Sequence, residues 1–388
     1  MESLQEMIMR VSQELSCRPT SRSVAEHLDQ HDDLSHLRQE FIIPKISDLP
    51  PSDLSLVDGS EDCVYFVGNS LGLQPKSAKK YIDEELEKWA KMGIHGHTEG
   101  SRPWAWAEEN LEEQMANVVG AKPEEVALMN GLTVNLHLLM LSFYKPTPKR
   151  HKILLEDKAF PSDHGCFVGF DCAHAVGNVE LQLHDWNVDF ACWCSYKYVN
   201  SGAGGLAGAF IHEKHIYTIK PALLGWWGHD LKTRFRMNNE MELQSGVNGF
   251  RLSNQPILLV CPLQASLEIF NKTSMKDLRR KSVLLTGYLE FLIKHYYSKD
   301  ESQPDKPFID IITPSDPEQR GCQLSLSFSL PIRAVFKELE RRGIACDLRE
   351  PNVLRIAPVP LYNTFTDVHR FITVLGSALS TTDKLHCS

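Results

Sequence analysis

The sequence has no long apolar run, no excess of basic residues and no internal repeat. Its longest apolar stretch, around 136–144, is far shorter than the roughly 20 residues that a membrane helix needs. The 41 Lys and Arg residues are outnumbered by 50 Asp and Glu residues, and a formal net charge of −9 argues against a protein built around nucleic-acid phosphates. These absences predict a protein with no membrane span and no nucleic-acid partner.

Cysteines are present, but the patterns that give them a metal or redox role are lacking. The ten cysteines are scattered from Cys17 to Cys387, without a CxxC pair and without the histidine spacing of a zinc site. The segment Met1–Leu15 carries charged residues, and its apolar residues fall at helical spacing, so it predicts an amphipathic helix rather than a secretory signal. We therefore expect free thiols in a cytoplasmic protein.

The central part of the chain alternates short apolar runs with helical patterns. The expected strands are 126–129, 153–155, 167–170 and 188–194, and the expected helices are 75–92, 108–119 and 133–142. Alternation of this kind is typical of an α/β fold with a mostly parallel sheet.

The C-terminal part reads as a separate, smaller α+β domain. The expected helices are 278–295, 332–341 and 367–379, and the expected strands are 308–312, 323–329 and 353–357. Residues 1–60 show short helices and turns broken by prolines. The sequence thus predicts an N-terminal arm over 1–60, a large domain over 61–272 and a small domain over 273–388.

Two ionisable residues follow two of the expected strands. Asp171 directly follows the expected strand 167–170, and Lys197 comes shortly after the apolar strand that ends at Cys194. Ligands of parallel sheets gather at the carboxyl ends of strands, so both side chains can face one pocket. Taken alone, a lysine at a strand end is most often a solvated charge. Together the pair suits pyridoxal phosphate (PLP), because a lysine amine binds its aldehyde and a carboxylate keeps its pyridine nitrogen protonated.

The remaining needs of a PLP site also have candidates in the chain. The stretch from Gly131 to Asn135 lies between a strand and a helix and includes Thr133, so it offers amide donors and a hydroxyl to a phosphate. Phe160 follows the expected strand 153–155 and can stack on a ring. Singly, such a threonine is most often a helix cap and such a phenylalanine is most often part of the core. Their order along the chain makes the combination specific.

The motifs NGLTVN, FPSDH, GFDCAHAVGN and CSYKY occur in the order found in class V enzymes of PLP fold type I. Within that class the chain resembles the kynureninases over essentially its whole length. The stretches that carry this resemblance are FVGNSLG at 66–72, GH at 96–97 with RPW at 102–104, GWWGH at 225–229, FRLSN at 250–254 and LRIAP at 354–358. The resemblance implies an aspartate-aminotransferase-like large domain that binds PLP.

The resemblance also implies roles for individual residues. Lys197 would bind the PLP aldehyde and later move the substrate α-proton, Asp171 would pair with the pyridine nitrogen, and Arg355 would hold the substrate carboxylate. The other residues implied at the cofactor are Leu132, Thr133, Phe160, Pro161, Ser162, Asp163, His174, Tyr196, Trp226 and Asn254, and those implied at the substrate are Ser70 and His97. Without the resemblance, His97 is equally well explained as a surface histidine. The family further implies a homodimer with sites at the subunit interface.

The chain departs from the family pattern in one place. Only seven residues separate Asp163 from Asp171, where relatives of this fold carry further strands and helices. The implied activity is hydrolysis of L-kynurenine or L-3-hydroxykynurenine to anthranilate or 3-hydroxyanthranilate plus L-alanine, in tryptophan catabolism and NAD biosynthesis. The gap leaves open an impaired or inactive variant that acts at most as a dimer partner. A cysteine desulfurase is a weaker alternative, since no cysteine lies in an evident catalytic loop.

Overall fold

The computed structural model describes residues 4–149, 151–153, 167–236, 239–303 and 306–386. Their contacts divide the chain into two compact units. One unit joins the N-terminal segment Met1–Gln74 to the C-terminal segment Thr273–Ser388, and the other is the continuous segment Pro75–Lys272. The sequence had suggested boundaries near residues 60 and 272. The difference lies at the N-terminus, whose helices pack into the core of the C-terminal segment.

The unit Pro75–Lys272 is built around a four-stranded sheet. Its strands are β4 (Val126–Leu128), β5 (Gly169–Asp171), β6 (Phe190–Trp193) and β7 (Gly208–Ile211), in the spatial order β4-β7-β6-β5. β5 pairs with β6 in parallel, whereas β7 is antiparallel to both of its neighbours. The sheet is therefore mixed: β4, β5 and β6 run in one direction and β7 runs against them, a reversal that the sequence pattern did not reveal.

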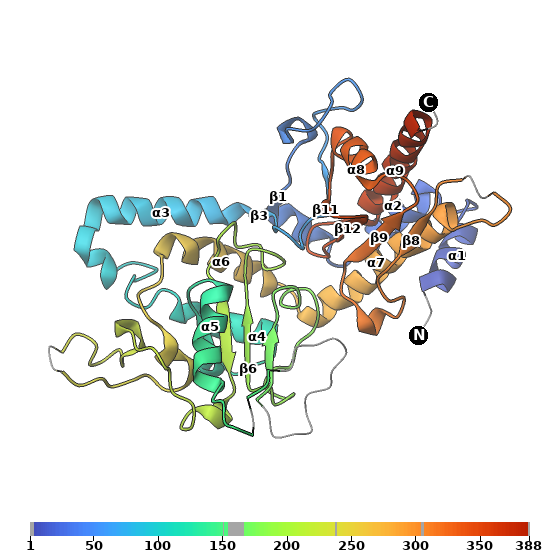
Figure 1. Cartoon of the computed structure of the whole chain (residues 1–388). Helices are drawn as coiled ribbons and strands as arrows, with labels where there is room; N and C mark the ends of the chain where they lie inside the picture. The colour runs from blue at the N-terminus through green and yellow to red at the C-terminus, as the bar shows by residue number, and fades with distance from the viewer. Residues whose placement is uncertain (1–3, 150, 154–166, 237–238, 304–305, 387–388) are drawn as a thin grey trace. The chain divides into compact units, whose positions relative to one another are not determined.

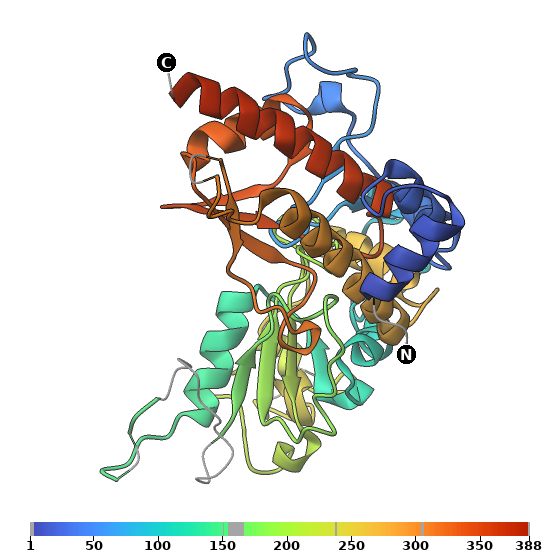
Figure 2. The same ribbon diagram turned by 90° about the vertical axis from the view of Figure 1, so that its right-hand side faces the viewer.

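Helices cover this sheet and extend beyond it. They are α3 (Lys76–Met92), α4 (Glu112–Val119), α5 (Leu132–Phe143) and α6 (Ile257–Phe270). α3 lies along α6 (Figure 1). α5 covers the sheet face that carries Phe190 and Cys192, and Figure 2 shows it on one side of the strands. α5 is apolar on almost every side, as expected for a helix that needs cover on more than one face.

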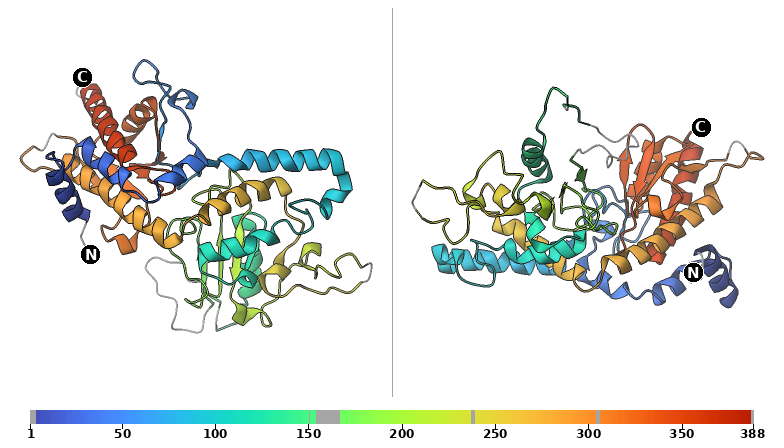
Figure 3. Two further views of the ribbon diagram at one scale, coloured as in Figure 1. Left: turned by 180° about the vertical axis from the view of Figure 1, so that it is seen from behind. Right: turned by 90° about the horizontal axis from the view of Figure 1, so that it is seen from below.

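The other unit contains a four-stranded antiparallel sheet. Its strands are β8 (Ile309–Ile311), β9 (Leu324–Phe328), β11 (Asp347–Arg349) and β12 (Val353–Ile356), in the order β11-β12-β9-β8. Side chains alternate along β9 between buried and half-buried, which is the pattern of a sheet with one covered face. Helices α7 (Met275–Tyr297), α8 (Ile332–Arg341) and α9 (Phe365–His386) provide that cover (Figure 3).

The N-terminal helices complete the core of this unit. α1 (Leu4–Glu14) and α2 (Arg22–Gln30) contribute Ile8, Val11 and Val24 to the same apolar cluster as α7 and α9. Four short strands accompany them: β1 (Phe41–Ile42), β2 (Val64–Tyr65), β3 (Gln74–Pro75) and β10 (Ile344–Ala345), of which β2 and β10 pair in parallel. The helices α1 and α2 and the strand β2 are thus part of a folded core.

Most of the elements expected from the sequence are present, with ends shifted by a few residues. The expected strand 153–155 falls mainly outside the described residues. α6 and β7 were not anticipated: α6 carries Pro262 in its interior, and β7 follows a glycine-rich stretch that reads as a loop. None of the eight cysteines in the described ranges forms a disulfide. None of the helices in these ranges combines the length and apolar character that a membrane crossing needs.

Candidate active site

Three of the expected site residues lie at one edge of the four-stranded sheet. Thr133 lies in α5, which follows β4; Asp171 is the last residue of β5; and Lys197 lies four residues beyond β6. Because β4, β5 and β6 run in the same direction, their carboxyl ends share that edge. The sheet therefore brings together the residues that the sequence predicted at one site.

Lys197 is half-buried and makes few polar contacts. Its Nζ lies 3.1 Å from Nε2 of His174 and 5.7 Å from the centre of the Tyr196 ring. Among the residues that the structure describes, no carboxylate forms an ion pair with it. A lysine that is not neutralised by a carboxylate remains available to a carbonyl group. His174, Tyr196 and Lys197, all predicted at the cofactor, thus lie together.

Asp171 is exposed at the end of β5, where its Oδ1 accepts a hydrogen bond of 3.0 Å from the amide of Ala173. Three buried thiols lie around it. Burial, with a smaller effect from the Asp171 carboxylate, raises the pKa of Cys172 to about 12, and burial also raises the pKa values of Cys192 and Cys194. These thiols therefore stay neutral at physiological pH. Asp171 is left as the acidic group that can face a cationic ring nitrogen here.

The N-terminus of α5 supplies backbone donors at the same edge. The helix begins at Leu132, and Thr133 is exposed in its first turn. The preceding turn is held by Asn135, which is fully buried and donates to the carbonyl of Met129 at 2.9 Å. Asn130 has a φ of 52°, and its backbone N–H donates to Oε1 of Gln255 at 3.1 Å. An anion can bind the amides that such a turn presents.

Asn135 and Gln255 are residues whose roles the sequence analysis missed. Both position the turn before α5. The signal for Asn135 was an amide side chain within an otherwise apolar helix, which requires a hydrogen-bond partner when buried. Gln255 gave no comparable signal, because its partner lies 125 positions away in the chain.

Trp226 and Asn254 lie in two neighbouring loops of the same unit. Trp226 is 53% exposed, and its indole Nε1 donates to the carbonyl of Arg234 at 2.8 Å. The next residue, Trp227, donates its amide to Leu252, which brings the Trp226 loop beside the loop of Asn254. Asn254 is exposed and adjoins Gln255. Both predicted residues are therefore accessible to a ligand.

The substrate-side predictions are divided between the two units. His97 is exposed, and its ring lies edge-on to Trp104 at 5.2 Å between centroids. Ser70 and Arg355 belong to the other unit. Arg355 lies on β12 at a position that alternates with the helix-covered residues, and its Nε contacts Oδ2 of Asp347 at 2.5 Å across the β11–β12 pair. Phe160, Pro161, Ser162 and Asp163 lie outside the described residues.

Comparison with known proteins decides the family. Residues 278–375 match the family model described as the kynureninase C-terminal domain. A kynureninase of Mus musculus is 53% identical and one of Homo sapiens is 54% identical, each alignment covering 97% of both chains. The chain belongs to the kynureninase family. A kynureninase of Nematostella vectensis is 45% identical, with 96% of this chain and 97% of that protein aligned.

Solved structures support the family fold. The chain is similar to the cysteine desulfurase CsdA of Escherichia coli, with a TM-score of 0.66, 13% identity and coverage of 90% of this chain and 99% of that one. It is also similar to the apo cysteine desulfurase of Thermococcus onnurineus NA1, with a TM-score of 0.65, 15% identity and coverage of 82% and 95%. At these identities the likeness shows the fold alone. It agrees with the predicted PLP fold type I.

The comparison also shows that the chain is shorter inside than its relatives. The alignment with the mouse kynureninase spans 451 positions, whereas this chain has 388 residues, so at least 63 positions of the mouse protein face a gap. Both chains are covered almost from end to end, so the gap is internal. This agrees in size with the loss of strands and helices that the sequence predicts between Asp163 and Asp171.

Proposed function

We propose that the chain is a PLP-dependent hydrolase that cleaves L-kynurenine or L-3-hydroxykynurenine to anthranilate or 3-hydroxyanthranilate plus L-alanine. This activity serves tryptophan catabolism and NAD biosynthesis. The proposal is supported by membership of the kynureninase family together with the convergence of Thr133, Asp171 and Lys197 on one sheet edge. Sequence likeness over nearly the whole chain favours an enzyme over an inert variant.

The residues present fit the cofactor. PLP needs an amine for its aldehyde, an acid for its ring nitrogen and donors for its phosphate, and when bound it stores the negative charge of a deprotonated substrate carbon. Lys197 is free of carboxylate partners in the described chain, Asp171 is ionisable and accessible, and the N-terminus of α5 carries amides and a hydroxyl. The site therefore offers an amine, an acid and phosphate donors, which are the three kinds of group that PLP needs.

The chain's own residues divide the work as follows. Lys197 would hold the cofactor through its ε-amine, and the same amine would move the substrate α-proton. His174 contacts the amine from 3.1 Å and orients it. Asp171 would hold a proton on the ring nitrogen by its charge. In the overall reaction, one water would supply the hydroxyl group of the aromatic acid at Cγ and a proton for Cβ as the bond between Cβ and Cγ breaks. Arg355, Ser70 and His97 bind the substrate.

We further propose a cytoplasmic homodimer in which Pro75–Lys272 is the PLP-binding domain. The dimer is supported by large apolar side chains that are exposed to solvent in the single chain. Leu224 is 56% exposed, Trp226 53% and Phe235 64%, all within one stretch of the chain. Exposed apolar groups of this kind commonly mark a protein interface. Trp226 would then serve the site of the neighbouring subunit.

The test combines absorbance spectroscopy with turnover. Purified chain is titrated with PLP and assayed with kynurenine, beside Lys197→Ala and the control Lys220→Ala. Lys220 is exposed in the same unit and lies outside the site. We expect Lys197→Ala to lose the absorbance band of lysine-bound PLP and all turnover, with unchanged expression, because a strand-end lysine committed to a cofactor contributes little to packing. Turnover above background in this variant would contradict the proposal.

A further inference from the structure

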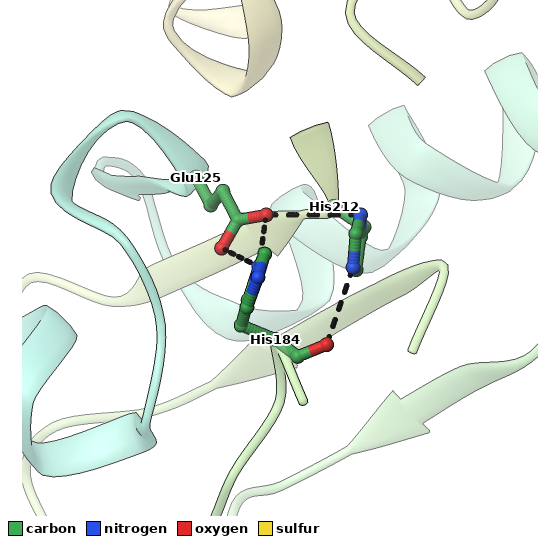
Figure 4. A group of neighbouring side chains, drawn as sticks. All are labelled: Glu125, His184 and His212. Atoms are coloured by element: carbon green, nitrogen blue, oxygen red, sulfur yellow. Dashed lines mark hydrogen bonds and ion pairs between the residues drawn. The ribbon is translucent and has the colours of Figure 1, made fainter. Parts of the chain in front are cut away.

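Glu125, His184 and His212 form a cluster at the sheet edge opposite to the one that carries Lys197. Glu125 directly precedes β4, His184 precedes β6, and His212 directly follows β7. Because β7 is antiparallel, its end lies at the edge where β4 and β6 begin. Figure 4 shows the three side chains pointing toward one another from three separate segments. The proposed catalytic mechanism uses none of them.

The spacing of the ligand atoms suits a tetrahedral transition-metal ion. Oε1 of Glu125 lies 3.0 Å from Nδ1 of His184 and 3.7 Å from Nδ1 of His212. All three ligand atoms lie within 4.8 Å of one another. Two ligands bound to zinc at about 2.0–2.1 Å and at a tetrahedral angle are about 3.3 Å apart. The two distances to Glu125 bracket that value.

His212 already has the tautomer of a metal-ligating histidine. Its Nε2 donates to the carbonyl oxygen of His184 at 3.2 Å, while its Nδ1 accepts the amide N–H of Lys214 at 3.1 Å. This tautomer carries its lone pair on the nitrogen that faces Glu125. Ligating histidines commonly donate their second nitrogen to a backbone carbonyl in this way.

Glu125 is a buried carboxyl residue that forms no ion pair with a lysine or arginine within the described chain. Its side chain is fully buried, and its two oxygens accept the amides of Glu213 at 2.8 Å and Lys122 at 3.0 Å. The ammonium of Lys122 instead binds the carboxylate of Glu213 at 2.6 Å. A buried carboxylate is favourable only when it is paired or coordinated. The His184 ring contacts both oxygens through Nδ1, at 3.0 and 3.1 Å, and a bound cation would replace this contact.

We propose that Glu125, His184 and His212 bind one zinc-class divalent ion through a carboxylate oxygen and two imidazole Nδ1 atoms. A water molecule would complete the fourth position, and the His184 side chain is 25% exposed. On binding, the proton of His184 moves from Nδ1 to Nε2, and the amide of Lys214 releases Nδ1 of His212. One ring must also turn, because the two imidazoles are stacked at 15°. The ion would have a structural role, joining three segments at this edge.

The test uses the full chain freed of metal with a chelator and titrated with Zn²⁺. Calorimetry should find one tight site per chain. X-ray absorption of the one-zinc protein should show nitrogen and oxygen ligands at about 2.0–2.1 Å and no sulfur at about 2.3 Å, which separates this cluster from the cysteines. No tight site, or sulfur among the ligands, would overturn the proposal and leave the cluster as a hydrogen-bonded brace.

Variants locate the ion. His184→Gln removes a ligand at a partly exposed position and should lower zinc affinity roughly 100-fold or more, since loss of an outer-shell partner alone costs about 10- to 100-fold. Glu125→Gln should act in the same direction if that variant folds. His95→Gln, at an exposed histidine in the same unit, is the matched control. Equal zinc affinity in His184→Gln and His95→Gln would also overturn the proposal.

Discussion

Asp171 and Cys172 are neighbours at the end of β5, and burial raises the pKa of the Cys172 thiol to about 12, so the thiol is neutral at physiological pH. We therefore expect Asp171→Asn to keep PLP bound and to lower turnover by roughly 100-fold or more, as for other lost electrostatic contacts in active sites. An amide has the shape of the acid but cannot hold a ring proton by charge. PLP absorbance and kynurenine hydrolysis measure the two effects separately.

The control for this substitution is Asp185→Asn, which neutralises an exposed aspartate of the same unit. It should leave both PLP binding and turnover near their original values. Nearly normal turnover in Asp171→Asn would instead make Asp171 a residue of the β5 turn only, through its hydrogen bond to the amide of Ala173.

Arg355 tests the substrate side of the site. Arg355→Lys should raise KM for kynurenine by about 10- to 100-fold with a smaller effect on kcat, because an ammonium cannot reproduce the two-point contact of a guanidinium with a carboxylate. Arg349→Lys is the matched control: Arg349 also contacts Asp347, at 3.3 Å, but its side chain is 57% exposed. The measurement is best made with the missing segment restored if the chain alone turns over slowly. Equal KM values for the two variants would remove Arg355 from the substrate site.

At the scale of elements, the local sequence pattern predicted those helices and strands that depend mainly on neighbouring residues. The apolar spacing of 75–92 gave α3 almost to the residue, since an amphipathic helix needs only its own periodicity. The local sequence pattern could not predict the direction of β7, because the direction of a strand depends on its pairing. The partners of β7 are β4 and β6, which are separate segments of the chain. The sequence pattern also predicted that Lys197 follows a strand. It could not predict that Gln255 positions the turn before α5, because Gln255 accepts a hydrogen bond from Asn130, which is far away in the chain.

Asp189 connects three elements and carries a prediction about pH. Burial acts to raise its pKa, but hydrogen bonds from Lys214, His215 and the amide of Val168 outweigh burial, and its pKa lies below the usual value. A depressed pKa stabilises the fold above the unfolded pKa of about 3.9, and this contribution is lost as the pH falls below it. Asp189→Asn should therefore lower stability at pH 7 by about 1.5–3 kcal/mol.

Denaturant unfolding at a series of pH values tests this expectation. The stability difference between the original chain and Asp189→Asn should be constant near neutrality and should shrink as the pH falls below about 4. The exposed Asp185→Asn should show little difference at any pH. A deficit that persists unchanged in acid would mean that Asp189 acts through its shape and not through its charge.

For the whole molecule, the internal gap of at least 63 positions is predicted to lie between Asp163 and Asp171, in the unit that carries Lys197. β5 is an edge strand of the described sheet, and all three of its residues are exposed. Nearby Phe167 is 49% exposed, and Leu141 of the apolar helix α5 is 56% exposed. Edge strands and apolar faces left open in this way invite aggregation. At about 25 cal/mol per Å², each 100 Å² of uncovered apolar surface costs about 2.5 kcal/mol.

A domain is stable by only about 5–15 kcal/mol, so this loss is a large part of the margin. We expect restoration of the missing segment from a full-length relative to raise PLP affinity by roughly tenfold or more, equivalent to about 1.4 kcal/mol, and to raise turnover. With the gap at its predicted position between Asp163 and Asp171, Asp171 and Lys197 follow it and Thr133 precedes it, so restoration should mainly improve the phosphate contacts of α5. PLP titration and kynurenine hydrolysis by the two chains side by side decide the matter. Equal affinity and equal turnover would show that the shortened sheet holds its site without the segment.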